Sequence, residues 1–221
     1  MAAGSTPGRP IRLVAMRRRE GLNGEAFQRH WRDVHGPLMA AIPGITYLQN
    51  HVAEGPAAAW AVDGFAWIDL PPQPTPTAGA AAAQDLPNFV GASTRLLCCV
   101  NDVVPPQANC ASKIIQVVHP IDATGRDPRS GEGFASHLGA VLHVPGLAGC
   151  RRNVVTGVLP VTEPRIGDLG MRALCVVEAW FADMRIARSA LASRPWAIVR
   201  DEAAALGYHT DEYLAEEIRI A

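Results

Sequence analysis

A segment that contains a histidine occurs twice in this chain, at a constant offset of 102 residues. The first copy covers residues 31–52 and the second covers residues 133–154. The matching positions are His35 and His137, Pro43-Gly44 and Pro145-Gly146, and Val52 and Val154. The apolar segment 11–16 falls on 113–118 without a gap. Internal similarity over such a period indicates one supersecondary unit built twice, which needs its neighbour to bury its apolar surface.

Hydrophobic patterns predict the order strand–helix–strand–strand–helix–strand in both copies. In the first copy we expect strands at 11–17, 45–53, 60–70 and 95–104, a helix that begins after the N-cap Asn23 and ends at Pro43-Gly44, and a short helix within 80–90. In the second copy we expect strands at 113–119, 147–157, 172–181 and 213–220, and helices at 133–143 and 183–205, the latter disturbed at Pro195.

These elements divide the chain into four parts. We expect a disordered leader at 1–10, an N-terminal repeat at 11–104, a linker at 105–112 and a C-terminal repeat at 113–221. Within the repeats, the Pro-rich stretch 71–79 is interpreted as a surface connection. The loop before the strand at 172–181 is longer than its counterpart in the first copy, and we expect it to cover one mouth of a barrel.

Each unit of this order is a ferredoxin-like α+β fold, a four-stranded antiparallel sheet with two helices on one face. The other face must also be buried, so we expect the two sheets to pack together and enclose an eight-stranded, barrel-like space. Burying about 400 Å² of apolar surface on each sheet would contribute about 20 kcal/mol before entropy, at roughly 25 cal/mol per Å². Neither half is therefore expected to be stable alone.

Composition excludes several classes of function. The 221 residues are 48% hydrophobic with a net charge of −1, so nucleic acid and membrane surfaces are not expected partners. No apolar run is long enough for a bilayer and the first ten residues lack a secretory signal. The five cysteines form no Cys-x-x-Cys pair, which is typical of a reduced, cytoplasmic protein without disulfides.

His35 is the strongest candidate for a catalytic residue. It shares a helix face with Trp31 and Leu38, and Gly36-Pro37 follows it directly. Proline interrupts the hydrogen bonds of a helix, so we expect a kink that opens space beside the imidazole. A neutral imidazole with a pKa of roughly 6.5 suits proton transfer at neutral pH. The alternative is a buried histidine that holds the helix to the sheet.

The motif around His35 resembles a known family. Phe27-x3-Trp31-x3-His35-Gly-Pro-Leu is followed by Pro43-Gly44, Tyr47 and Asn50-His51-Val52, and this pattern is similar to the EthD signature. The second copy keeps His137, Pro145 and Gly146 but resembles the family only in outline. The resemblance implies the dimeric α/β-barrel fold, here as two fused repeats in one chain. It also implies a cofactor-free enzyme that acts on small organic molecules.

Polar residues on the second strand of each copy are further candidates. Alternation places Tyr47, Gln49 and His51 on one face, which we expect to be the helix-free face that looks into a wet cavity. An exposed strand histidine is the alternative. At the fixed offset His51 falls on Asn153, with Arg151 on the same face. Either Arg151 or Arg152 must face inward, where its guanidinium could bind a carboxylate or enolate.

Three other features are weighed against ordinary structural roles. His137 is either a second site or a degenerate copy, and we favour the degenerate copy. Trp67 and Trp180 occupy equivalent strands and could stack a ring, although core packing is the favoured interpretation. His30 lies five residues before His35, about 140° around an α-helix, so the pair is not expected to share a metal. We expect no metal site and no cofactor, because no ligand spacing or nucleotide motif is present.

The resulting hypothesis is a cofactor-independent lyase or isomerase that acts on a small cyclic, phenolic or lactone-like molecule by dehydration, cyclisation or lactone isomerisation. His35 and His51 would transfer protons. The substrate would lie between the sheet and the first helix, with contacts from Trp31, Tyr47, Trp67, His137, Arg151 and Asn153. The alternatives are a non-catalytic binding or accessory protein and a cofactor-free monooxygenase. A homodimer of the fused chain is left open.

Overall fold

The computed structural model describes residues 9–56, 61–69, 79–120 and 132–221. The N-terminal repeat contains β1 (Arg9–Arg18), α1 (Gly24–His30), the π-helical turn η1 (Trp31–His35), α2 (Gly36–Ala40), β2 (Thr46–Glu54), β3 (Gly64–Asp69), α3 (Ala80–Phe89) and β4 (Val90–Val104). Most of the expected leader, the residue Trp60 and nearly all of the Pro-rich connection lie outside the described residues.

The C-terminal repeat has the same order of main elements. It contains β5 (Ser112–Pro120), α4 (Glu132–Leu142), β6 (Gly149–Leu159), β7 (Gly167–Asp168), β8 (Cys175–Phe181), α5 (Met184–Leu191), α6 (Arg194–Ala205) and β9 (Tyr208–Arg219). The expected single helix at 183–205 is two helices. Ser193 caps the second one by accepting a hydrogen bond from the backbone of Trp196, and Pro195 occupies its first turn, where no backbone donor is needed.

Eight of the described strands close into one barrel. The order is β1-β3-β2-β9-β5-β8-β6-β4, and β4 pairs again with β1. Each repeat supplies four neighbouring strands, and the repeats join through the antiparallel pairs β2–β9 and β4–β6. The predicted α+β architecture, two ferredoxin-like repeats that form a single-chain α/β barrel, is confirmed.

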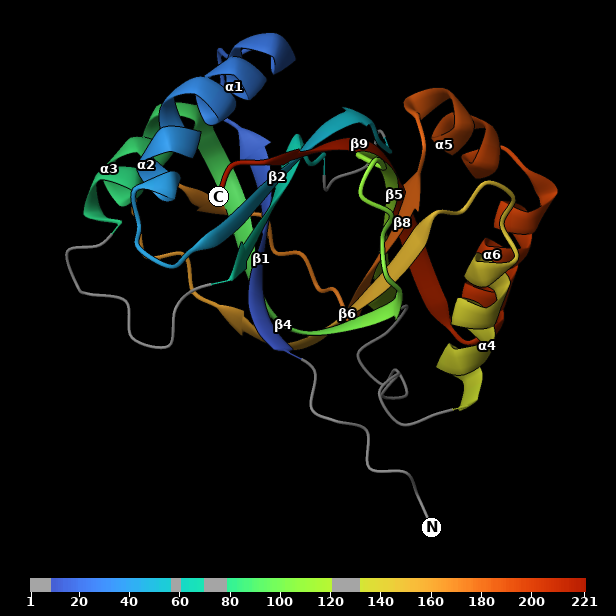
Figure 1. The fold of residues 1–221 in the computed structure, drawn as a ribbon. Coiled ribbons are helices and arrows are strands. Elements are labelled where there is room, and N and C mark those ends of the chain that lie inside the picture. The colour runs from blue at the N-terminus through green and yellow to red at the C-terminus, as the bar shows by residue number, and fades with distance from the viewer. Residues whose placement is uncertain (1–8, 57–60, 70–78, 121–131) are drawn as a thin grey trace.

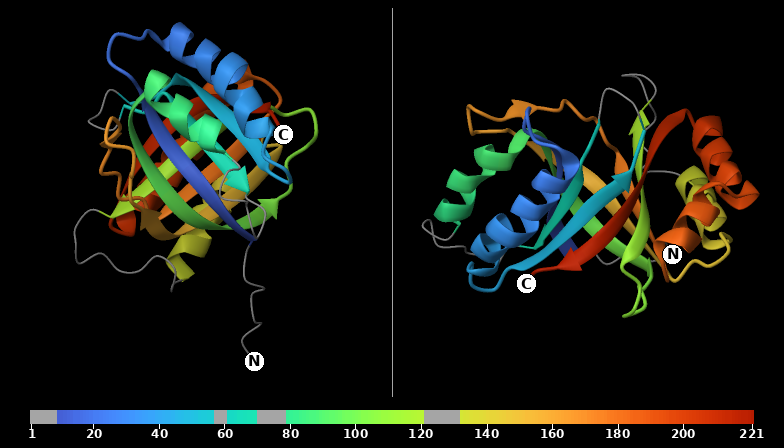
Figure 2. Two further views of the ribbon diagram at one scale, coloured as in Figure 1. Left: turned by 90° about the vertical axis from the view of Figure 1, so that its left-hand side faces the viewer. Right: turned by 90° about the horizontal axis from the view of Figure 1, so that it is seen from above.

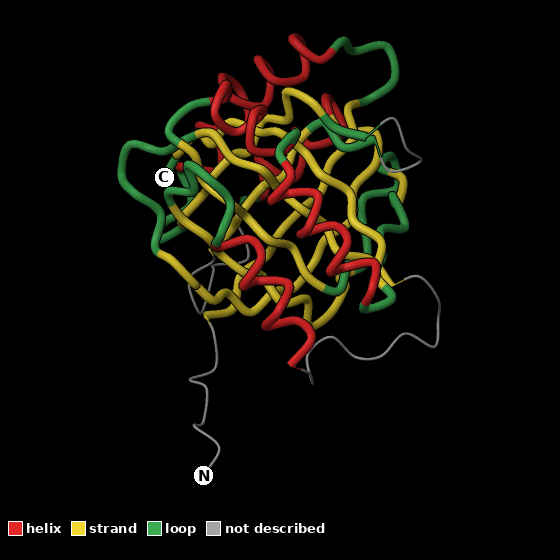
Figure 3. The backbone as a smooth tube through the Cα atoms, turned by 90° about the vertical axis from the view of Figure 1, so that its right-hand side faces the viewer, coloured by secondary structure: helices red, strands yellow, loops and turns green. Residues whose placement is uncertain are grey.

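The helices lie on two opposite sides of the barrel (Figures 1 and 2). Helices α1, α2 and α3 cover the N-terminal sheet, and α4, α5 and α6 cover the C-terminal one. Figure 3 looks onto the second layer, with the strands running behind it. No helix in the described ranges is long and apolar enough to cross a membrane. Each layer has its own apolar core, and a third core fills the barrel between them.

Alternation along the strands assigns side chains to these cores. Leu13, Phe65 and Trp67 point into the barrel, whereas Val14 and Ala66 point toward the helices. The barrel interior is therefore filled mainly by buried apolar side chains from both repeats, and Trp67 and Trp180 are both among the fully buried residues. Core packing, the favoured interpretation of this tryptophan pair, agrees with their burial.

The segment between β6 and β8 packs against one end of the barrel. Leu169 and Met171 belong to the barrel core, and β7 pairs with β4 of the other repeat through Ala92 and Ser93. Ile166, just before β7, packs instead against the core under the N-terminal helices. The C-terminal repeat therefore contributes to the helix-covered layer of its partner repeat.

One ion-pair cluster lies inside the barrel. The Lys113 side chain is fully buried, and its Nζ lies 2.7 Å from Glu178 and 2.6 Å from Glu217. The ammonium also lies 4.3 Å from the centre of the Trp180 ring. Burial alone would raise the pKa of Glu178, but the charges of Lys113 and Arg151 outweigh burial and lower it. Glu178 is therefore a buried carboxylate that depends on its cationic neighbours.

We predict that Lys113→Met lowers the free energy of unfolding by about 3–5 kcal/mol, because it leaves a buried carboxylate without its main counter-charge. Chemical denaturation measures this loss, and Lys113→Met/Glu178→Met should recover part of it. The exposed pair Arg29–Glu25 provides the control, since Arg29→Ala should change stability by less than about 0.5 kcal/mol. A loss below about 1 kcal/mol for Lys113→Met would contradict the assignment.

Candidate active site

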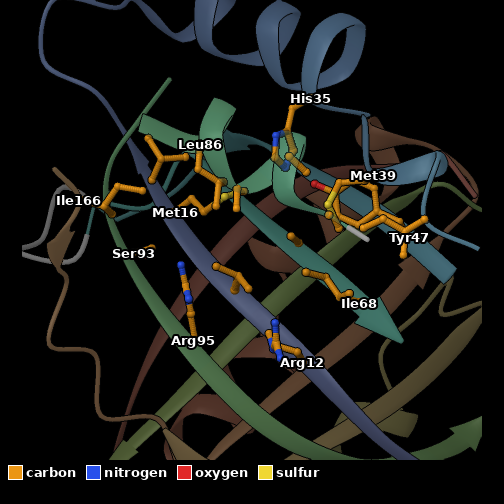
Figure 4. Close-up of a pocket in the computed structure, with 17 residues that line it drawn as sticks. Arg12, Met16, His35, Met39, Tyr47, Ile68, Leu86, Ser93, Arg95 and Ile166 are labelled. Atoms are coloured by element: carbon orange, nitrogen blue, oxygen red, sulfur yellow. The ribbon is translucent and has the colours of Figure 1, made fainter. Parts of the chain in front are cut away.

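A cavity of about 390 Å³ lies between the N-terminal sheet and its helices. Its floor is the outer face of β1, β2, β3 and β4, and its roof comes from η1, α2 and α3. Ile166 of the C-terminal repeat closes one side. The polar side chains among its described lining residues are Arg12, His35, Tyr47, Ser93 and Arg95. Figure 4 shows His35 pointing into this space.

A π-helical turn places His35 over the cavity. Asn23 caps α1 as predicted, by accepting a hydrogen bond from the backbone of Ala26. The backbone N–H of Gly36 then bonds to the carbonyl of Trp31, five residues earlier, instead of four. Pro37 has no N–H to donate to the preceding turn, and the widened turn accommodates this loss. The expected disturbance at Gly36-Pro37 is therefore a local widening that begins just before it.

The widened turn brings two histidines to one carboxylate. Asp85 of α3 lies 3.1 Å from Nδ1 of His35 and 2.9 Å from Nε2 of His30. Asn88 donates a third hydrogen bond to Asp85, at 3.0 Å. We expected His30 and His35 to lie about 140° apart, which holds for a regular α-helix. The segment between them is a π-helical turn, so both side chains reach Asp85. Asp85 was not among the predicted site residues, because it lies on a weakly patterned helix 50 residues away.

The contact with Asp85 determines the tautomer of His35. A carboxylate accepts hydrogen bonds, so Nδ1 of His35 carries the hydrogen and the lone pair lies on Nε2. Burial lowers the pKa of His35 below 6.5, and the hydrogen bond and charge of Asp85 partly offset this effect. His35 is therefore neutral at pH 7, with its basic nitrogen available on a ring that lines the cavity.

Tyr47 lies beside this imidazole. Its ring centre is 6.3 Å from that of His35. Its hydroxyl accepts a 2.7 Å hydrogen bond from the indole N–H of Trp31, which holds the phenol in place. Burial raises the pKa of Tyr47 above its usual 10, so it remains a hydrogen-bond donor at neutral pH. Trp31 itself packs against the backbone of Gly64, where a side chain would collide with the indole ring. It supports the site without lining the cavity.

His51 lies beneath Trp31 and does not line the cavity. The two ring centres are 4.6 Å apart, and Nε2 of His51 lies 2.8 Å from Oε1 of Gln49. Gln49 in turn donates to the backbone carbonyl of Trp31, at 2.8 Å. Burial, with a smaller effect of Arg32, lowers the pKa of His51 to about 4. This arrangement lets His51 support the π-helical turn.

The expectation that Tyr47, Gln49 and His51 face away from the helices is wrong. These side chains lie under α1 and η1, while Leu48 between them points into the barrel. Asn153 also points into the barrel, where it bonds to Glu178 at 2.9 Å. His51 and Asn153 thus face opposite sides of the barrel wall.

The strand pairings explain this difference. Leu48 faces Trp67 on β3, but the residue that faces the equivalent Trp180 is Gly149, which gives an offset of 101 for this strand. A shift of one residue reverses the faces of a strand.

Arg151 and Trp67 also belong to the barrel interior. The guanidinium of Arg151 lies 5.3 Å from the centre of the Trp67 ring and 5.1 Å from that of Trp180. It also pairs with Asp102 at 2.6 Å. The predicted set of site residues is therefore split by the barrel wall, and only His35 and Tyr47 of that set line the cavity.

Comparison with known proteins identifies the part of the chain that holds this site. Residues 19–90 match the model of the EthD domain. We refer to this part of the chain as the EthD domain, after the model that it matches. It includes the π-helical turn, Tyr47 and Asp85, and the resemblance predicted from the residues around His35 is confirmed. A search of curated proteins finds no match to the chain.

Solved structures resemble the whole fused chain. An anthrone oxidase-like protein aligns with a TM-score of 0.56 at 8% identity, over 96% of this chain and 93% of that one. A mutant chlorite dismutase from Candidatus Nitrospira defluvii gives 0.55 at 9%, over 97% and 94%. A protein from Lactobacillus acidophilus NCFM, named as a candidate monooxygenase, gives 0.52 at 9%, over 96% and 95%. At these identities the likeness establishes the dimeric α/β-barrel fold.

The C-terminal repeat differs from the EthD domain at His137, the position that matches His35. Both ring nitrogens of His137 are engaged: Nδ1 lies 3.1 Å from the carbonyl oxygen of Val199, and Nε2 lies 2.9 Å from Gln116. A backbone carbonyl thus replaces the carboxylate of Asp85. Gln116 occupies the strand position that matches Val14 of the cavity floor. This geometry fits a structural histidine.

The described residues contain no group of three or more histidine, cysteine, aspartate or glutamate side chains that could hold a metal ion. All five cysteines are free. The described residues that line the cavity include His35, which can transfer a proton, Tyr47, which can donate a hydrogen bond, and the cationic groups of Arg12 and Arg95.

We predict that Asp85→Asn lowers the pKa of His35 further, because it removes the negative charge that favours the imidazolium and leaves only a neutral amide oxygen as the hydrogen-bond acceptor. Titration of the histidine ring signals by nuclear magnetic resonance measures this shift. Asp33→Asn, on the exposed side of η1, is the matched control and should leave the pKa of His35 unchanged. A rise in the pKa of His35 in Asp85→Asn would contradict the assigned contact.

Proposed function

We propose that this protein is a cofactor-independent acid–base catalyst, of the lyase or isomerase type, for a small cyclic, phenolic or lactone-like molecule. The observation that carries the proposal is the contact between Asp85 and Nδ1 of His35, which leaves a neutral, basic Nε2 on a ring that lines a largely apolar cavity. A general base requires this protonation state at the working pH. The named enzymes among the structural neighbours support a catalytic role on small molecules.

The proposed reaction begins with transfer of a proton from an acidic C–H or O–H bond of the substrate to Nε2 of His35. For a C–H bond the electron pair moves onto the oxygen of the adjacent carbonyl group, and for an O–H bond it stays on the oxygen that loses the proton. The hydroxyl of Tyr47 donates a hydrogen bond to this oxygen. The imidazolium, stabilised by Asp85, then returns the proton to another carbon in an isomerisation. In a dehydration it gives the proton to a departing hydroxyl group, which leaves as water.

His51 has no proton-transfer step in this proposal, because it lies behind Trp31 and its Nε2 is engaged by Gln49. His137 is likewise omitted, since both of its ring nitrogens have partners. The single EthD domain would therefore hold the working site, and the C-terminal repeat would complete the barrel and supply Ile166 to the cavity.

Cofactor-free oxygenation is a second candidate, and it shares the first step. A substrate anion formed by His35 could react with dioxygen instead of being reprotonated. The names of two structural neighbours, an anthrone oxidase-like protein and a candidate monooxygenase, favour this possibility. Oxygen consumption with quinol-type substrates separates the two candidates, because a lyase or isomerase consumes none.

We predict that the protein accelerates hydrogen–deuterium exchange at the acidic carbon of 2-tetralone in D₂O, measured by nuclear magnetic resonance. His35→Gln should reduce the rate about 10²–10⁴-fold, the usual contribution of general base catalysis. The rate should rise with pH through the lowered pKa of His35 and level off below pH 6.5. Asp85→Asn should move this rise to lower pH and reduce the plateau rate.

The control for this experiment is His143→Gln, which replaces an exposed histidine of the C-terminal repeat. This variant should exchange at the wild-type rate. Full activity of a folded His35→Gln protein would refute the proposal. Saturable quenching of tryptophan fluorescence by small aromatic ligands, with neither exchange nor oxygen consumption, would instead support a non-catalytic binding protein.

A further inference from the structure

The cavity has a cationic end opposite His35. Arg12 on β1 and Arg95 on β4 both line it, and Figure 4 shows them on the far side of the space from the imidazole. In the pairing of these two strands Val14 faces Arg95, and Arg12 lies two residues before Val14. The two arginines are therefore diagonal neighbours on the helix-facing side of the barrel wall, where long side chains can reach each other.

Neither arginine is paired with a carboxylate of the described chain, and the described lining residues include no aspartate or glutamate. The Nε atom of Arg12 is buried and has no hydrogen-bond partner among the described residues. Other arginines of the same strands and of the barrel interior do have acidic partners, as in the pairs Arg9–Asp69, Arg18–Asp63 and Arg151–Asp102.

This arrangement is unfavourable without an anion. Burial lowers the pKa of Arg12, and the nearby charge of Arg95 lowers it further. Arginine nevertheless remains protonated at neutral pH. Two like charges that are partly withdrawn from water cost free energy unless an opposite charge compensates them. A bound anion would provide this compensation.

The C-terminal repeat shows that the barrel does not require these arginines. On the matching pair of strands, Gln116 faces Glu212, as Val14 faces Arg95 in the N-terminal repeat. Ile114 occupies the position that matches Arg12. The arginine pair is therefore found in the repeat with the open cavity and is absent from the equivalent positions of the other repeat.

We propose that Arg12 and Arg95 bind a carboxylate group of the substrate, so that the cavity selects small, largely apolar acids. The planar guanidinium group matches the two oxygens of a carboxylate, which favours this anion. The apolar floor and roof, including Val14, Ile68 and Leu86, would enclose the body of the molecule. The proposed function is needed only to assign the reactive end of the substrate to His35.

The test compares acids with their uncharged amides in equilibrium binding. Isothermal titration calorimetry with benzoate, cinnamate and 2-naphthoate, and with the three corresponding amides, should show that the wild-type protein prefers the acid in at least one pair by tenfold or more. Arg12→Met and Arg95→Met should each weaken binding of that acid about 10–100-fold, the usual range for a hydrogen bond to a charged group. Binding of the amide should change little.

Arg17→Met is the matched control, because Arg17 lies on the same strand but is exposed and outside the cavity. It should bind the acids as the wild-type protein does. If a methionine variant does not fold, Arg12→Lys and Arg95→Lys keep the charge without the planar group and should show a smaller loss. The absence of any preference for acids, or equal affinities in wild-type protein and the arginine variants, would overturn the proposal.

The same titrations with His35→Gln separate this inference from the proposed function. That variant should retain the preference for acids, because binding of the carboxylate does not involve the base. Acid-selective binding without catalysis of exchange would leave the arginine site intact and remove the proposed function. Catalysis of exchange without acid-selective binding would leave the proposed function intact and remove the arginine site.

Discussion

Closure of the barrel is the constraint on which the rest of the structure depends. Each repeat has a sheet with helices on one face only, and its other face must be covered by the second repeat. The pairs β2–β9 and β4–β6 join the two sheets and leave no edge between them. Closure directs Leu13, Phe65 and Trp67 into a shared core, and it directs the alternate residues of the same strands toward the helices.

This division of the strands decides where chemistry can occur. The barrel interior is packed, and its charged groups are occupied by one another, as in the cluster of Lys113, Glu178 and Arg151. The cavity that His35 lines lies outside the barrel wall, under the helices of the EthD domain. Among the polar groups that face it, His35 and the two arginines line opposite ends of a largely apolar cavity (Figure 4).

The two repeats have kept the architecture and diverged in the site. His35 and His137 occupy matching positions, but the first is oriented by the carboxylate of Asp85 and the second is held by a backbone carbonyl and Gln116. In a barrel made of two chains both sites would have the same sequence. Fusion allows one repeat to carry the site and the other to serve as a structural partner that also contributes Ile166.

The sequence by itself determined the repeat, the order of the strands and helices, the cap at Asn23 and the family resemblance of the segment around His35. These follow from hydrophobic period, turn residues and a local motif, all of which are properties of neighbouring residues. Only the tertiary structure decided which polar residues meet. Asp85 reaches His35, and Arg95 reaches the cavity, from elements far along the chain. The one-residue change of register that separates His51 from Asn153 is not visible in a fixed offset, because strand pairing, and not sequence spacing, determines which face of the barrel wall a side chain occupies.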